Sequence, residues 1–140
     1  MEYKRENEKY FIKLEKGEEV IKTLTLFCYQ NDIKSGIISG IGGANEVTVK
    51  FFDIDKKEYV PKDFSAKNFE ILSLTGNVSL VEEKPFIHIH AIFGDSEYKI
   101  FGGHLSKAVI GITAEIEIRK TEHVLIRKPD SEFGLNYWSL

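Results

Sequence analysis

The sequence predicts an α+β domain in which a curved, mostly antiparallel β-sheet carries one main helix. Helical spacing of apolar residues occurs in one long segment, about residues 18–32. The segments after it alternate or are apolar, and they are separated by short connections that suit antiparallel pairing better than βαβ crossovers. A chain of 140 residues has the length of one domain, so residues 1–140 are expected to fold as a single unit.

The predicted elements follow from local patterns. Glu18 and Glu19 are placed in the first turn of the helix, where negative charge suits the helix dipole. The glycines of 40–43 lack the phosphate-loop spacing and are expected to form a tight turn with close backbone approach. The expected strands are Tyr10–Leu14, Ile37–Ile41, Glu46–Ile54, Phe69–Leu80, Phe86–Phe93, Tyr98–Ile110 and Thr113–Arg119.

Charge and composition exclude several classes of protein. The net charge is −3, with 19 basic and 22 acidic residues, which is the wrong sign for holding nucleic acid through the protein's own surface. Cys28 is the only cysteine, so an intramolecular disulfide and a multi-cysteine zinc site are both excluded. Met1–Lys16 has no apolar signal core and no apolar run reaches the ~20 residues of a membrane span, so a cytoplasmic location without membrane contact is expected.

Three of the four histidines lie close together in the sequence. His88 and His90 are two residues apart in a predicted strand and therefore project from the same face. His104 lies on the next predicted strand. Neutral imidazole is a common zinc ligand, so the three side chains are candidate ligands of a divalent metal, with zinc favoured. Three protein ligands would leave a fourth position for water or a substrate.

The register of the predicted hairpin decides whether these histidines meet. We expect His104 opposite His88 and Gly102 opposite His90, where a glycine would leave room for an imidazole or a ligand. That register requires an odd-numbered loop or a bulge between the strands, because an even-numbered loop would turn His104 to the opposite face. The alternative interpretation is that the histidines are core or interface residues bonded to the backbone and to one another.

Several segments resemble a known family, the plants-and-prokaryotes conserved (PPC) domain. The most specific part is H-x-H followed by G-G-H, and the resemblance runs from about residue 3 to residue 130 in the order and spacing of the family. The architecture is also similar to that of acetolactate decarboxylase, which holds zinc with a similar histidine set. The matching segments are Phe69–Asn77, Pro85–His90, Phe101–Leu105, Gly17–Val20, Ser39–Gly42, Glu115–Glu117 and Arg127.

The resemblance implies a homotrimer and a metal-binding role for His88, His90 and His104. PPC domains occur alone in bacteria and archaea, and in land plants they stand beside AT-hook DNA-binding motifs. The Arg-Gly-Arg-Pro core of an AT-hook does not occur in these 140 residues. DNA binding that belongs to the hooks is therefore not expected of this chain alone.

Two functions from different classes fit the sequence. The first is a metal-dependent enzyme acting on a small oxygen-rich molecule near the metal, with Glu70 and Arg127 as candidate catalytic helpers. The simpler interpretation of Glu70 is a solvated strand-end carboxylate, and that of Arg127 is a surface residue. The second function is a non-catalytic trimeric module that binds a ligand or a protein. A DNA-binding-associated regulatory role, as in the plant AT-hook relatives, is a further alternative that the charge disfavours.

Overall fold

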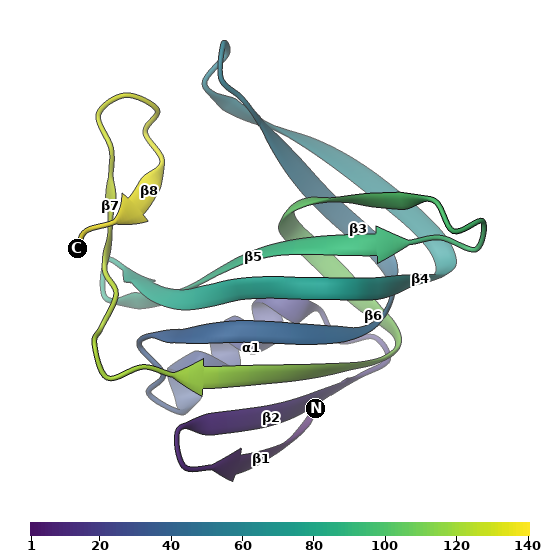
Figure 1. The fold of residues 1–140 in the computed structure, drawn as a ribbon, viewed down its shortest axis with the longest axis horizontal. Coiled ribbons are helices and arrows are strands. Elements are labelled where there is room, and N and C mark those ends of the chain that lie inside the picture. The colour runs from purple at the N-terminus through teal and green to yellow at the C-terminus, as the bar shows by residue number, and fades with distance from the viewer.

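The computed structural model describes all residues from Met1 to Leu140 and confirms the α+β fold. Six strands form one antiparallel sheet in the order β1-β2-β6-β3-β4-β5, and one helix covers a face of it (Figure 1). The elements are β1 Glu2–Glu6, β2 Lys9–Glu15, α1 Val20–Gln30, β3 Gly36–Asp53, β4 Glu58–Val81, β5 Lys84–Gly94, β6 Ile100–Lys120, β7 Arg127–Pro129 and β8 Asn136–Trp138.

The sheet is curved because β6 changes its partner along its length. Ile100–His104 pair with β5, whereas the stretch from His104 to Lys120 pairs with β3. Since β3, β4 and β5 also follow one another in the sheet, the additional β5–β6 pairing closes these strands on themselves. β7 and β8 form a separate two-stranded hairpin at the C-terminal end (Figure 1). The expectation of a strongly curved sheet is therefore confirmed.

Helix α1 buries its apolar side on the sheet and is shorter than the sequence indicates. Val20, Leu24, Phe27 and Cys28 are buried in the main core of 26 residues. The predicted acidic first turn is wrong, because Glu19 is the N-cap and Glu18 precedes it. The Glu19 carboxylate accepts hydrogen bonds from the backbone N–H groups of the first turn and, at 3.1 Å, from the N–H of residue 108 in β6. It therefore joins the helix start to the sheet.

Two pairs of predicted strands are each one continuous strand. Segment 37–41 and residues 46–53 of segment 46–54 both belong to β3, and the two C-terminal predicted strands both belong to β6 from Ile100 onward. The glycines of 40–43 make no tight turn, because β3 is paired with β4 and β6 on its two sides and absorbs the irregularity as register shifts. The expected close approach is confirmed, since a Cβ on Gly42 would lie 2.5 Å from the carbonyl oxygen of Thr113.

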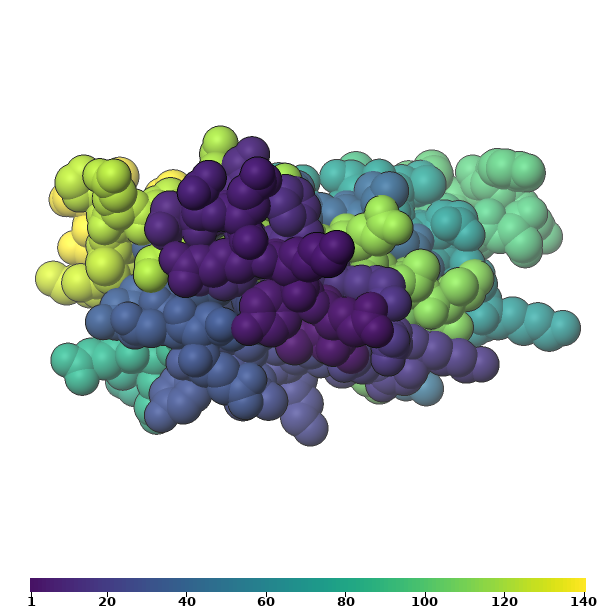
Figure 2. All heavy atoms as spheres, turned by 90° about the horizontal axis from the view of Figure 1, so that it is seen from below, coloured from purple at the N-terminus to yellow at the C-terminus, as the bar shows by residue number.

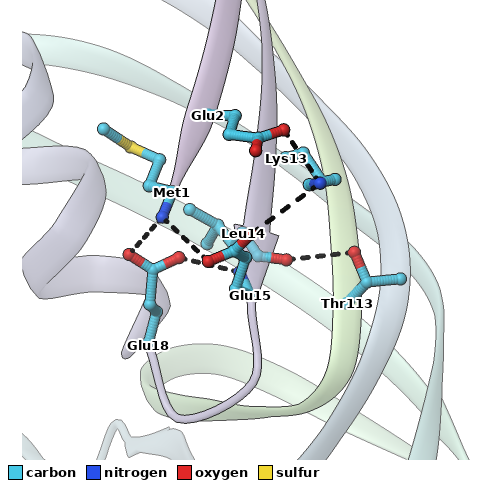
Figure 3. A network of polar contacts seen from close by, with 7 residues as sticks. All are labelled: Met1, Glu2, Lys13, Leu14, Glu15, Glu18 and Thr113. Carbon is cyan, nitrogen blue, oxygen red and sulfur yellow. Dashed lines mark hydrogen bonds and ion pairs between the residues drawn. The ribbon is translucent and has the colours of Figure 1, made fainter.

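The N-terminal hairpin β1–β2 forms one edge of the sheet and lies across the front of the molecule in Figure 2. Polar contacts attach it to its neighbours (Figure 3). Lys13 lies 2.9 Å from Glu2 within the hairpin, and the Thr113 hydroxyl of β6 donates to the carbonyl oxygen of Leu14 at 3.0 Å. The amino group of Met1 lies 3.0 Å from the carboxylate of Glu18. Strand β1, whose residues are all exposed, is not among the strands expected from the sequence.

Replacing Glu19 with Ala is expected to lower the free energy of unfolding by about 2 kcal/mol, since the change removes an N-cap and a contact to β6. Urea unfolding followed by circular dichroism measures the change. Glu122→Ala, at an exposed acidic residue, is the matched control and should alter stability by less than about 0.5 kcal/mol. Equal effects of the two substitutions would contradict the capping role.

Candidate metal centre

His88 and His90 project from β5 on the sheet face opposite to α1. Strand geometry causes this, because the residues between and around them, Ile87, Ile89 and Ala91, are buried in the core that the helix covers. His88 is half-buried and His90 is exposed. On β4, Asn77 is the pairing partner of His88. The prediction that the two histidines share one face is confirmed.

His104 lies at the point where β6 leaves β5 and joins β3. It is paired with His90 on one side and with Lys50 on the other. The predicted register, with His88 opposite His104, is therefore wrong by two residues. The physical reason is the position of the turn between β5 and β6, because Asp95 accepts hydrogen bonds from the backbone N–H groups of Glu97 and Lys99 and stabilises a five-residue turn centred on Glu97, one residue later than the predicted register requires.

The loop is nevertheless odd-numbered, so His104 stays on the face that carries His88 and His90. Gly102 lies opposite Ile92 rather than His90. The absence of a side chain at Gly102 lets β5 and β6 approach closely and does not make room for an imidazole. A Cβ at this position would lie 2.4 Å from the carbonyl oxygen of Ala91.

The three imidazoles converge on one point. One ring nitrogen of each lies within 4.8 Å of those of the other two, and the ring centroids are 5.0–5.4 Å apart. Tetrahedral zinc, with bonds of about 2.0–2.1 Å, brings its ligand nitrogens to about 3.3 Å, which small side-chain rotations can reach from here. The Nδ1 atom of His104 is buried without a hydrogen-bond partner. A bound ion or ligand would satisfy such an atom, so the residues present fit a metal ion.

Burial keeps two of the candidate ligands neutral. Desolvation, helped by the positive charge of Arg127, lowers the pKa of His88 to about 4. Desolvation also lowers the pKa of His104 to about 4, with smaller contributions from His90, Lys50 and Arg127. A neutral imidazole has one unprotonated nitrogen, so both residues are in the protonation state that binds a metal at neutral pH.

Arg127 is buried beside His88, and the expectation of a surface role for it is wrong. Only 9% of the residue is exposed. Its Nη2 donates to Nδ1 of His88 at 2.8 Å and to Oδ1 of Asn77 at 3.1 Å. Its Nε donates to the hydroxyl of Ser79 at 2.8 Å, and its Nη1 donates to the carbonyl oxygen of Asn136 at 2.7 Å. Arg127 therefore connects β4, β5 and the C-terminal hairpin.

Glu70 does not join the histidines. It is paired with Gly94 at the far end of β5, is exposed, and accepts a hydrogen bond from the side-chain amide of Asn68. Its geometry agrees with a solvated strand-end carboxylate. Cys28 does not belong to the site either. It is buried in the core, and burial raises the pKa of its thiol to about 12.

A cavity of about 200 Å³ opens beside the histidines. Its wall includes residues that the sequence analysis missed. Tyr59, from the β3–β4 hairpin, lies against His104 with ring centroids 5.0 Å apart, and the C-terminal hairpin contributes residues 134–137. Nothing in the local sequence marks these residues, since the fold alone brings the two hairpins to the histidine face. The cavity is lined by Tyr59, Phe86, His88, His104, Arg127, Gly134, Leu135, Asn136 and Tyr137.

Comparison with known proteins identifies the family. The chain belongs to the Plants and Prokaryotes Conserved (PCC) domain family, the PPC family named above, whose family model matches residues 1–122. A search of curated proteins finds no match.

The helix of this chain is too short to cross a membrane, and no longer apolar helix is present.

Solved structures of similar sequence share the whole fold. A candidate DNA-binding protein from Bacteroides thetaiotaomicron is 33% identical, with a TM-score of 0.95 and coverage of 99% of this chain and 96% of that one. A PPC protein from Pyrococcus horikoshii is 31% identical, with a TM-score of 0.87 and coverage of 99% and 94%. A metal-containing protein from Archaeoglobus fulgidus is 30% identical, with a TM-score of 0.87 and coverage of 99% and 97%.

A more distant similarity concerns the fold alone. Acetolactate decarboxylase from Bacillus subtilis is 13% identical, with a TM-score of 0.59 over 89% of this chain and 57% of that one. The architecture expected from the sequence is confirmed by this match.

Acidification is expected to destabilise the metal-free protein between about pH 6.5 and pH 4. An unfolded histidine titrates near 6.5, whereas folding lowers the pKa of His88 and His104 to about 4, so the unfolded state binds more protons within this window. Thermal melting at pH 7.5 and pH 5, with a chelator present, measures the loss. The loss should be smaller in His104→Asn. An identical loss of melting temperature in the parent and in His104→Asn would contradict the claim that the neutral, buried His104 causes the acid sensitivity.

Proposed function

We propose that this protein binds one divalent metal ion, with zinc favoured, through His88, His90 and His104, and that it acts on a small oxygen-rich molecule at that ion. The convergence of the three imidazoles, with ligand atoms within 4.8 Å of one another, is the observation that carries the proposal. The description of the Archaeoglobus fulgidus relative as metal-containing supports it.

The ion, when bound, would supply Lewis-acid chemistry, polarising a carbonyl group or lowering the pKa of water. The chain's own residues provide the surroundings. Arg127 donates to the His88 ring in the metal-free chain, Tyr59 packs against His104, and aromatic side chains form part of the cavity wall. Three protein ligands leave a position for a substrate, which favours a catalytic role over a closed structural one. Glu70, on β4 opposite the far end of β5, lies too far from the histidines to take part, which leaves Arg127 as the candidate catalytic helper.

We propose further that the protein is a homotrimer, as the family resemblance implies. The apolar surface of the sheet supports self-association. A groove of about 840 Å³, part of it on the face opposite to α1, is lined partly by exposed Phe11, Ile41 and Leu72. Large exposed apolar patches are uncommon on monomers. A non-catalytic trimeric binding module remains the second candidate function, and it would be favoured if metal removal dissociated the trimer.

Removing one ligand should remove the metal. The parent is expected to hold about one ion per chain, and His90→Ala should weaken binding by more than about a hundredfold, since even outer-shell partners of a metal are worth 10–100-fold. Elemental analysis and zinc titration measure the difference. His123→Ala, at the fourth histidine, is the matched control and should bind zinc like the parent. If His90→Ala binds zinc as tightly as the parent, His90 is not a ligand.

Light scattering should give a mass near three times the 16.0 kDa of one chain. Ile41→Glu, which places a charge in the groove at a residue 57% exposed, should shift the mass toward that of a monomer. Ile54→Glu is the control, because Ile54 is 66% exposed but lies at the β3–β4 turn, outside the groove. A monomer mass for the parent would refute the trimer.

DNA binding, suggested by the name of the Bacteroides thetaiotaomicron relative, is not proposed for this chain. The net charge of −3 offers little counterion release to drive such binding. We expect no gel shift of duplex DNA by micromolar protein at physiological salt. A salt-sensitive shift at sub-micromolar protein would overturn this expectation.

A further inference from the structure

We propose that the cavity beside the histidines binds a small carboxylate, and that Arg127 is the residue that recognises it. The inference rests on the proposed metal function and names the class of its substrate. It follows from the hydrogen bonds of Arg127, from the charges around the cavity and from the cavity's size.

The hydrogen bond between Arg127 and His88 is incompatible with a metal ion bound to His88. The guanidinium group has donors and no acceptor, so at the 2.8 Å contact Nδ1 of His88 must accept the hydrogen bond. A neutral imidazole has one lone pair, and here that lone pair is used by Arg127. If Nδ1 binds a metal, the lone pair is taken; if Nε2 binds it, Nδ1 carries the proton. In either case the Arg127 donor loses its acceptor when His88 becomes a ligand.

Arg127 cannot turn to solvent when it loses this acceptor. Its other hydrogen bonds, to Ser79, Asn77 and the carbonyl oxygen of Asn136, hold the guanidinium at three further points. Phe86 and Trp138 lie against it, with ring centroids 5.3 Å and 5.7 Å from Cζ. A charged donor left without a partner at 9% exposure is costly, and an oxygen of a ligand in the adjoining cavity would satisfy it.

The site carries positive charge that no carboxylate of the chain balances. Neither Arg127 nor Lys50, which is paired with His104, forms an ion pair with a carboxylate. The three candidate ligands are imidazoles, so the chain places no negative charge among them. A dication held here would add two positive charges to a partly buried and already positive site. Buried charge requires a counter-charge, and an anionic ligand supplies it.

The size and the wall of the cavity indicate the class of anion that fits it. The cavity of about 200 Å³ is smaller than the ~300–1,000 Å³ pockets that hold drug-sized ligands. Tyr59, Phe86 and Leu135 provide apolar surface beside the Arg127 donor. A short organic acid fits this combination of size, apolar wall and cation better than a nucleotide or inorganic phosphate.

The test uses lactate as the probe and its uncharged analogue lactamide as the matched ligand, with Co²⁺ as a spectroscopically visible metal. Two readouts are followed, the visible absorption of Co²⁺ and the fluorescence of Trp138, the only tryptophan and a neighbour of Arg127. The Co²⁺ protein should bind lactate about tenfold or more tightly than lactamide, as expected for a charge-assisted hydrogen bond. The metal-free protein should bind lactate at least tenfold more weakly than the Co²⁺ protein.

Variants separate recognition by Arg127 from simple coordination of the metal. Arg127→Gln should keep Co²⁺ and lose about tenfold in lactate affinity. If it does not fold, Lys50→Gln should weaken lactate binding several-fold, whereas Lys99→Gln, in the exposed β5–β6 loop, should not. Equal binding of lactate and lactamide, tighter binding of inorganic phosphate, or unchanged lactate affinity in both site variants would overturn the carboxylate site. Failure of the parent to bind Co²⁺ would instead overturn the proposed metal function, on which this site depends.

Discussion

The pairing of β5 with the first five residues of β6 is the constraint on which the rest of the site depends. It closes the curved sheet, and its last pair joins His90 to His104. Since His104 is also paired with Lys50 of β3, one residue fixes the positions of three strands at the place where the imidazoles meet. Backbone hydrogen bonds rather than flexible loops thus set the spacing of all three candidate ligands, and the backbone of a site held in this way needs little reorganisation to bind an ion.

A second layer of contacts connects this place to the rest of the chain. Arg127 is far from the histidines in sequence, yet it bonds to His88, to two side chains of β4 and to the backbone of the C-terminal hairpin. The β3–β4 hairpin adds Tyr59 against His104. The β3–β4 hairpin and the C-terminal hairpin therefore form part of the cavity wall. A ligand that enters the cavity must pack against the aromatic surface and pair with the buried cation.

Local sequence patterns were enough to predict the fold class, the helix and the face that His88 and His90 share, because these follow from periods of 3.6 and 2 residues. They could not give the register of β5 against β6, which depends on the conformation of the five-residue loop that Asp95 stabilises. They also could not place Arg127, whose burial arises from contacts with residues nearly 50 positions away. An arginine is exposed in most proteins, so only the assembled fold reveals this one as part of the site.

The central claim is that one metal ion lies between the nitrogens of His88, His90 and His104. Diffraction from crystals of the zinc-loaded protein, measured on both sides of the zinc absorption edge, tests it directly. The account predicts a single strong anomalous peak per chain at about 2.0–2.1 Å from one nitrogen of each histidine, with the Arg127 donor no longer bonded to Nδ1 of His88. A peak elsewhere on the chain, or no peak in crystals grown with excess zinc, would contradict it.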